Sequence, residues 1–356
     1  MKLVLDNGME FCGDGFGACE TAVGDLVFNT SVVGYQEMLS DPSYAGKIVL
    51  MTYPVIGQYG IADEDFESKT IGASGLVVRE YCDTPSNFRF TQTLSENMEE
   101  RRIPGISGLD TRMLTHIIRD NGPVRAAIVP DSFSSDAVSK LLEGGRDDDM
   151  GLVRRASCTK RWFSRTPNHK FDVVVLDCGV KHSAIAALNA LGCNVTVLPF
   201  DSGYDEIMSF HPDGVMISSG PGDAHRMGSI VEVIKALRGK VPVVGTGLGF
   251  ELILLGYGEK LEKLRCGEYG GAPVAQASSG RIISVHCNRS FTAGDKLSTP
   301  WLEVSYRNVC DKAVVGFECA KEKVSAVQFH PEGGPGSCES DFFEKFIKMM
   351  EDVRNA

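Results

Sequence analysis

Short apolar runs alternate with helix-patterned segments throughout the second half of the chain, from residue 171 onward. A strand that is buried on both faces needs a nearly continuous run of valine, isoleucine and leucine, whereas a helix buries one residue in every three or four. Alternation of the two patterns with short links predicts an α/β domain built on a doubly wound, mostly parallel sheet. The predicted strands are residues 173–176, 195–200, 214–217, 241–244 and 324–327, with helices over 184–191, 230–237 and 250–256.

The first 150 residues show a different pattern, with short strands and turns that end in helical segments at 111–121 and 135–143. We expect an N-terminal α+β domain over 1–150, closed by a polar break at 144–149. Residues 151–170 hold two basic pairs and no clear apolar period, which is typical of a linker. The α/β domain is then expected over 171–356.

The net charge of −11 argues against nucleic acid and anionic membranes as partners, because both call for clustered lysine and arginine. No apolar run reaches the ~20 residues that span a bilayer, and the N-terminus does not resemble a signal peptide. The eleven cysteines are scattered, without zinc spacing, as expected of free thiols in a reducing compartment. We therefore expect a cytoplasmic protein without a bound metal.

Two glycine-rich loops follow predicted strands, at residues 218–223 (Ser-Ser-Gly-Pro-Gly-Asp) and 245–249 (Gly-Thr-Gly-Leu-Gly). Ligands of such sheets bind at the carboxyl ends of the strands. The second loop has the form of a nucleophile elbow, with Gly247 at its apex. Farther on, His330 and Glu332 lie two residues apart after a strand, so that the carboxylate can orient the imidazole as a general base. A structural interpretation of the His330–Glu332 pair remains open, but the chain order of all three features favours a site for acyl transfer.

The C-terminal half resembles the class I (triad) glutamine amidotransferase domain. The N-terminal half resembles the small subunit of carbamoyl phosphate synthase, through the motifs at residues 28–31, 34–37, 41–46, 51–54 and 104–108. The resemblance implies a subunit that attacks glutamine with an elbow cysteine and delivers ammonia to a large subunit. That partner would use ATP, magnesium and bicarbonate to make carbamoyl phosphate for arginine and pyrimidine synthesis, so no cofactor is expected on this chain.

By the same resemblance, His330 is the general base and Glu332 its orienter, and the backbone N–H groups of Gly220 and Leu248 serve the oxyanion. The positions that bind glutamine are Ser43, Gly222, Glu251, Asn288, Ser290 and Phe291, although Ser290 replaces a glycine of the family.

The elbow departs from the family pattern Gly-Ile-Cys-Leu-Gly-His-Gln at its reactive position. Gly247 replaces the nucleophilic cysteine, Phe250 replaces the histidine, and Glu251 replaces the glutamine. Covalent attack needs the missing thiolate. The sequence therefore predicts weak or lost glutaminase activity and a holoenzyme that uses free ammonia.

Other interpretations of the altered pocket remain open. Cys178, Cys266 or Cys287 could replace the lost nucleophile, although we favour structural roles for all three. A hydrolase that uses Thr246 is a weaker possibility. Alternatively, the chain is a binding or regulatory module outside the pathway, with Phe250, Tyr269 and Arg289 as its recognition groups.

Overall fold

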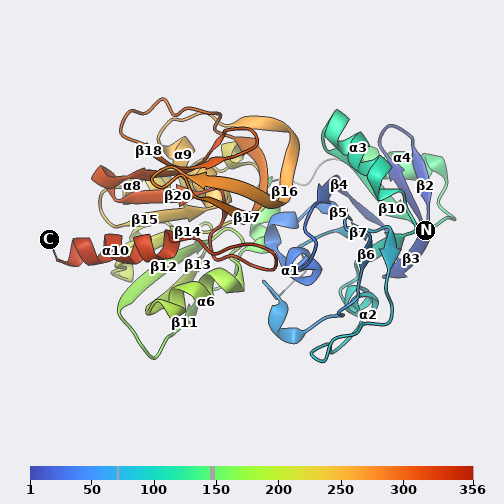
Figure 1. Cartoon of the computed structure of the whole chain (residues 1–356), viewed down its shortest axis with the longest axis horizontal. Coiled ribbons are helices and arrows are strands. Elements are labelled where there is room, and N and C mark those ends of the chain that lie inside the picture. Colours follow the sequence, from blue (N-terminus) through green and yellow to red (C-terminus); the bar gives the residue numbers. More distant parts are fainter. Residues whose placement is uncertain (70–71, 145–148, 356) are drawn as a thin grey trace. The chain divides into compact units, whose positions relative to one another are not determined.

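The computed structural model describes residues 1–69, 72–144 and 149–355. The chain forms two compact units, of which unit 1 comprises residues 1–148 and 265–270 and unit 2 comprises 149–264 and 271–356 (Figure 1). The sequence placed a boundary at about residue 150 but gave no sign that residues 265–270 return to unit 1. Residues 145–148, within the predicted break at 144–149, lie outside the described residues.

Unit 1 is built on an eight-stranded mixed sheet in the order β2-β1-β10-β4-β5-β7-β9-β3. Its middle strands β4, β5, β7 and β9 are parallel, and the flanking strands pair antiparallel. The strands are β1 Lys2–Leu5, β2 Glu10–Cys12, β3 Asp14–Gly17, β4 Ala22–Asn29, β5 Lys47–Met51, β7 Gly75–Val77, β9 Pro104–Ser107 and β10 Val124–Val129, with a separate parallel pair of β6 Val55–Ile56 and β8 Glu80–Tyr81.

The helices of unit 1 are α1 Tyr35–Ser40, α2 Leu94–Glu100, α3 Thr111–Asn121 and α4 Ser135–Glu143. Helix α3 coincides with the predicted helix over 111–121. It begins where the Asp110 carboxylate accepts the Met113 N–H at 2.9 Å and ends at Gly122, whose φ of 90° an L-residue rarely adopts. Leu114 and Ile118 of α3 are buried against the sheet.

Unit 2 is built on an eleven-stranded sheet in the order β11-β13-β12-β14-β15-β20-β19-β18-β16-β17-β21. Strands β13, β12, β14, β15 and β20 form its parallel core, as predicted, and the other strands extend it antiparallel. The strands are β11 Trp162–Ser164, β12 Phe171–Asp177, β13 Cys193–Pro199, β14 Gly214–Ile217, β15 Val243–Thr246, β16 Glu262–Gln276, β17 Ile282–Thr292, β18 Glu303–Asn308, β19 Val314–Cys319, β20 Val324–Val327 and β21 Phe329–His330.

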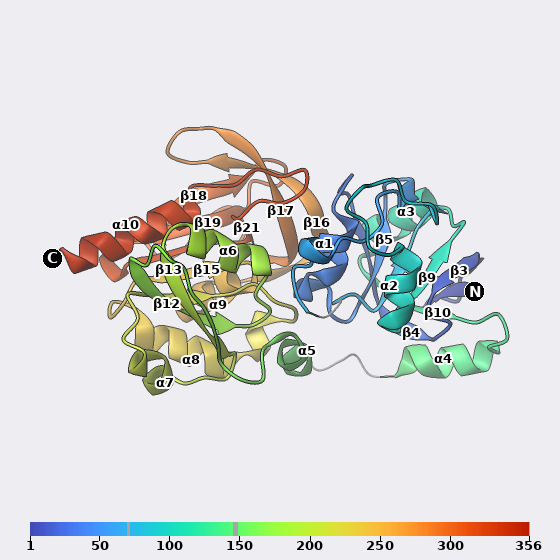
Figure 2. The same cartoon turned by 90° about the horizontal axis from the view of Figure 1, so that it is seen from below.

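Helices cover both faces of the parallel core, as Figure 2 shows for α7 and α8 on one side and α6 and α10 on the other. The helices are α5 Asp149–Ala156, α6 His182–Ala190, α7 Tyr204–Ser209, α8 Gly228–Leu237, α9 Leu248–Gly256 and α10 Phe342–Arg354. Alternate residues of β12 enter opposite hydrophobic clusters, Val174 on the side of α8 and Val175 on the side of α6. Burial on both faces is the physical reason for the valine runs of the sequence.

The prediction of a linker over 151–170 is wrong, because the segment holds most of α5 and all of β11. Leu152 and Val153 of α5 are buried. Strand β11 pairs antiparallel with β13 at the edge of the sheet, and the Cys158 N–H donates to the buried Asp177 carboxylate at 2.7 Å. The basic pairs that suggested a linker lie on the exposed side of these elements, at residues 154–155 and 160–161.

Candidate functional site

Gly247 forms the turn between β15 and α9, at the carboxyl end of the parallel core. Its backbone angles are φ 53° and ψ −113°, a conformation that only glycine adopts at low cost. Its N–H donates to the Val327 carbonyl of β20 at 2.9 Å, which fixes the turn against the neighbouring strand. A Cβ at this position would lie 3.0 Å from the Cβ of Ser219. The turn therefore keeps the strained form of a nucleophile elbow but presents no side chain.

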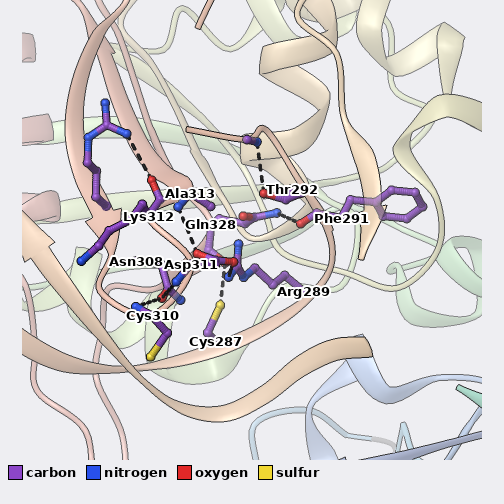
Figure 3. A network of polar contacts seen from close by, with 12 residues as sticks. Cys287, Arg289, Phe291, Thr292, Asn308, Cys310, Asp311, Lys312, Ala313 and Gln328 are labelled. Carbon is purple, nitrogen blue, oxygen red and sulfur yellow. Dashed lines mark hydrogen bonds and ion pairs between the residues drawn. The ribbon is translucent and has the colours of Figure 1, made fainter. Parts of the chain in front are cut away.

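The two altered residues after the elbow are buried and engaged. Phe250 is fully buried and its ring centroid lies 5.4 Å from that of Phe317, within the core. Oε1 of Glu251 accepts a hydrogen bond from Nε2 of Gln328 at 2.9 Å. The same Gln328 amide also donates to the Phe291 carbonyl at 2.9 Å, as Figure 3 shows. The buried carboxylate of Glu251 is therefore held by an amide of the protein itself.

Lys181, His330 and Glu332 form a buried charged cluster, which we call the charged cluster below. Lys181 precedes α6, and His330 lies on β21. Nζ of Lys181 lies 3.2 Å and Nδ1 of His330 lies 3.3 Å from Oε1 of Glu332, and all three side chains are at most 6% exposed. Oε1 of Glu332 thus lies beside one ring nitrogen of His330, the arrangement that the spacing of the two residues predicts. Lys181 could not be found from sequence spacing, because it lies 151 positions before Glu332.

Two opposing effects set the pKa of Glu332. Burial by itself raises the pKa of the carboxyl, but the Lys181 ammonium and the hydrogen bond from His330 outweigh it and lower the pKa to about 2. Glu332 is therefore a carboxylate at neutral pH, and its second oxygen, Oε2, accepts no hydrogen bond within the described residues.

Strand β17 carries three of the predicted site residues but divides them between its two faces. Asn288 and Ser290 are half-buried on the face that also carries His286, and Nδ2 of Asn288 lies 3.5 Å from Nε2 of His330. Phe291 points to the other face, where its ring centroid lies 5.5 Å from that of His225. Asn288 therefore lies beside the charged cluster, whereas the Phe291 ring packs near His225 on the opposite face of the strand.

Arg289 and Cys287 are buried on the same face of β17 as Phe291 (Figure 3). Nη2 of Arg289 lies 2.5 Å from Oδ2 of Asp311, and Sγ of Cys287 donates to the Gln328 carbonyl at 3.7 Å. Both side chains are therefore engaged within the protein.

The loop after β14 carries Gly220 and Gly222, and close packing explains both glycines. A Cβ at Gly220 would overlap the carbonyl oxygen of Cys178, and a Cβ at Gly222 would lie 2.8 Å from Cε of Met227. Leu248 is the first residue of α9, so its N–H has no acceptor within the helix. The loop and the helix start thus lie at the ends of strands β14 and β15, as predicted.

The cysteines proposed as substitute nucleophiles are poor candidates. Cys178 is fully buried, and burial together with the Asp177 carboxylate raises the pKa of its thiol. Cys266 belongs to unit 1, and burial raises the pKa of its thiol as well. Since the thiolate is the nucleophile, a raised pKa disfavours attack.

Ser43 and Tyr269 belong to unit 1. Ser43 is buried at the start of a short 3₁₀ turn, residues Pro42–Tyr44, where its N–H donates to the Asp41 carboxylate at 2.8 Å. The Tyr269 ring packs in the core of unit 1, 5.8 Å from that of Tyr44.

Within the described ranges, no group of three or more His, Cys, Asp or Glu side chains is arranged to hold a metal ion. No helix in those ranges is both long and apolar enough to cross a membrane.

Comparison with known proteins covers nearly the whole chain. Residues 3–128 match the family described as "Carbamoyl-phosphate synthase small chain, CPSase domain", and residues 174–350 match "Glutamine amidotransferase class-I". The carbamoyl phosphate synthase pyrimidine-specific small chain of Bacillus subtilis is 37% identical over 352 residues, which cover 98% of this chain and 96% of that protein. The chain belongs to the carbamoyl phosphate synthase small chain family.

Other relatives agree with this membership. The carbamoyl phosphate synthase small chain of Archaeoglobus fulgidus is 39% identical over 355 residues, 99% of each protein. The solved structure of a glutamine amidotransferase from Thermotoga maritima matches 52% of this chain and 83% of its own length, with 14% identity and a TM-score of 0.39. As a carbamoyl phosphate synthase small chain, the protein carries its amidotransferase region in unit 2, where the elbow, the Gly220 loop and the charged cluster lie.

Proposed function

We propose that this chain is the small subunit of a carbamoyl phosphate synthase whose large subunit takes its nitrogen from free ammonia. The single observation that carries the proposal is Gly247 at the apex of the elbow. Release of ammonia from glutamine by a class I amidotransferase passes through a thioester, in which a cysteine sulfur displaces the amide nitrogen. With hydrogen in place of a side chain at position 247, that bond has no sulfur to form it.

The remaining groups do not replace the thiolate. Enzymes that lose one member of a catalytic triad keep only about 10³–10⁴-fold acceleration over water, from oxyanion donors and binding. Here a residue expected to bind the substrate is altered too, because Glu251 lies at a position where the family has a glutamine and is hydrogen-bonded to Gln328. Both changes act in the same direction, toward loss of glutamine hydrolysis.

The charged cluster then has a structural role. Lys181 precedes α6 and His330 ends β21, so their shared contacts with Glu332 tie two elements at the carboxyl edge of the sheet. Removing one charge from a buried ion pair costs about 3–5 kcal/mol. The cluster is therefore retained for folding, whether or not His330 acts as a base.

The proposal places the synthesis of carbamoyl phosphate, with its ATP and magnesium, on a large subunit. Unit 1 carries the motifs by which the chain resembles the synthase, and we propose that the chain assembles with that subunit as a scaffold and regulator. A binding module outside the pathway would need Phe250, Tyr269 and Arg289 as open recognition groups. Phe250 and Tyr269 pack in cores and Arg289 pairs with Asp311, so we do not adopt this alternative.

The proposal is tested by co-expressing the chain with the large subunit of its own organism and assaying the purified complex with each nitrogen donor. We expect carbamoyl phosphate from ammonium chloride and at least about a thousandfold less from glutamine, in line with the loss of a nucleophile. Robust turnover with glutamine that His330→Asn abolishes would overturn the loss of glutaminase. Failure to recover the large subunit at a one-to-one ratio would instead overturn the assembly.

A further inference from the structure

Phe88, in the segment between β8 and α2, is exposed to an unusual degree. Its side chain is 97% exposed, whereas no other large apolar side chain among the described residues exceeds 60%. Isolated apolar residues on a surface are normal, but an exposed aromatic side chain gives up the free energy that its burial would contribute. Phe90, two positions later, is also exposed. We call residues 83–91 the Phe88 turn, which presents both aromatic side chains to solvent.

Backbone hydrogen bonds hold the Phe88 turn against an earlier segment of unit 1. The Ser86 N–H donates to the Gln58 carbonyl at 2.8 Å. The Thr91 N–H donates to the Ile61 carbonyl, also at 2.8 Å. The turn packs closely on Gly60, since a Cβ at that glycine would lie 2.8 Å from a side-chain carbon of the turn. Both ends of the turn are therefore fixed to the body of the unit.

Asn87 closes the interior of the turn just before Phe88. Its side-chain oxygen accepts the Arg89 N–H and its carbonyl accepts the Phe90 N–H, each at 3.2 Å. An asparagine side chain that accepts the N–H two residues later forms a compact local turn. Phe88 therefore lies at the tip of a well-held loop. An anchor that is held in place before binding loses less conformational entropy when a partner covers it, which favours affinity.

Carboxylates surround the Phe88 turn. Nη2 of Arg89 lies 3.0 Å from Oε2 of Glu64 and 2.7 Å from Oδ1 of Asp65. The carboxylates that belong to the turn or are bonded to its side chains are Asp63, Glu64, Asp65 and Asp83. Together with the single guanidinium of Arg89, these four groups leave an excess of negative charge around the aromatic tip. A partner surface of positive charge complements it.

We propose that the Phe88 turn is a docking anchor for the large subunit of carbamoyl phosphate synthase, which offers it an apolar pocket rimmed by lysine and arginine. This inference rests on the proposed function, which assigns that subunit as the partner. The turn lies within residues 3–128, the part of the chain that matches the family "Carbamoyl-phosphate synthase small chain, CPSase domain". Phe88 and Phe90 supply apolar area, and the four carboxylates supply orientation.

The charges decide against a second copy of this chain as the occupant. A symmetric dimer through the Phe88 turn would bring the same patch of both chains together, because a twofold interface is self-complementary. The four carboxylates of one chain would then face those of the other, and like charges across an interface disfavour association. The turn therefore fits a partner of opposite charge better than it fits itself.

The experiment measures the dissociation constant of the full chain for the purified large subunit of its own organism by surface plasmon resonance. Phe88→Ala should raise that constant at least about thirtyfold, because burial of a phenylalanine side chain contributes roughly that factor. Its thermal midpoint should not change, since the side chain is exposed. The matched control is Trp301→Ala, which also removes an exposed aromatic side chain but lies in unit 2 and should change the constant less than about twofold.

A second variant tests the carboxylates. Glu64→Gln with Asp83→Asn removes two negative charges and keeps the shape of both side chains. We expect the association rate at low salt to fall at least about threefold and its dependence on salt to weaken, whereas the dissociation rate changes little. An unchanged association rate with an unchanged salt dependence would contradict the positive rim of the partner.

Three results separate this inference from the proposed function. Tight binding of the unaltered chain, with equal constants for Phe88→Ala and Trp301→Ala, would overturn the anchor and leave the proposed function intact. No binding of the unaltered chain would overturn both, since the partner itself would be wrong. In sedimentation of the chain alone, a dimer that Phe88→Ala dissociates would assign the turn to a second copy and overturn the inference.

Discussion

Two parts of the amidotransferase region differ in the side chains that they present. One is the elbow, residues 247–251, and the other is the charged cluster of Lys181, His330 and Glu332. The apex of the elbow, Gly247, presents no side chain, whereas the three side chains of the cluster are buried and in contact. Folding physics accounts for the asymmetry. Glycine at a φ of 53° relieves strain, so replacement of the catalytic residue by glycine favours the fold. Removing a buried charge destabilises the fold, so folding alone favours an intact cluster.

The claim that the charged cluster stabilises the fold is tested by Glu332→Gln, which leaves the Lys181 ammonium buried without its carboxylate. This variant should have the largest effect. We expect the free energy of unfolding to fall by about 3–5 kcal/mol in denaturant titrations. The double variant Lys181→Met with Glu332→Gln should recover at least half of the loss, because no lone charge remains. A single variant within about 1 kcal/mol of the unaltered protein would show that the cluster does not stabilise the fold.

The pH dependence of stability tests the same carboxylate. The pKa of Glu332 is lowered from 4.5 to about 2 in the folded protein, so its contribution is fully present above pH 4.5 and is lost as the pH falls toward 2. The difference in unfolding free energy between the unaltered protein and Glu332→Gln should shrink by about 3 kcal/mol between pH 6 and pH 2. Parallel pH profiles for the two proteins would contradict the lowered pKa.

A third prediction concerns the elbow and tests what happens when a nucleophile is restored at position 247. Gly247→Cys supplies the sulfur, but Glu251 stays hydrogen-bonded to Gln328 where a neutral glutamine is expected. We expect its glutaminase rate, measured as ammonia release, to remain about a hundredfold below that of the triple variant Gly247→Cys, Phe250→His and Glu251→Gln. Equal rates in the two variants would show that residues 250 and 251 have no influence on glutamine binding.

The smallest expected effect concerns backbone strain at the elbow. Gly247→Ala should destabilise the protein by about 1–3 kcal/mol, because alanine resists the angles of the turn and its Cβ would crowd Ser219 at 3.0 Å. Gly228→Ala is the matched control, at the start of α8 with no atom near the added Cβ, and should change stability by less than about 0.5 kcal/mol or raise it. Thermal unfolding of both variants measures the difference, and equal midpoints would contradict strain at position 247.

The parallel core could be predicted because its strands are buried on both faces. Burial on both sides demands an unbroken apolar run, as at residues 173–176, and such a run is visible without any knowledge of partners. The strands β16 to β18 bury their residues irregularly or on one side, and their mixed sequences gave no comparable signal. Helix α5 and strand β11 were missed for a related reason, since only Leu152 and Val153 of α5 are buried behind exposed basic residues.

The candidate site was predictable where local sequence determines geometry. The turn at Gly247 and the alignment of His330 with Glu332 follow from a glycine-rich strand end and a spacing of two residues. Lys181 and the bond between Glu251 and Gln328 depend on contacts over 151 and 77 residues, which only the fold brings together. For the same reason the sequence alone does not name a partner for the Glu251 carboxylate, which the structure shows to be Gln328.

The central claim is that this chain forms no thioester with glutamine. It is tested most directly by the intact mass of the chain after incubation with glutamine and an acid quench. A glutaminase that works through a thioester gains the mass of glutamine less ammonia, and the bond survives in acid. We predict that the chain, in complex with its large subunit, keeps its unmodified mass while the complex makes carbamoyl phosphate from ammonium chloride. A chain that carries the acyl group, on any side chain, would contradict the account.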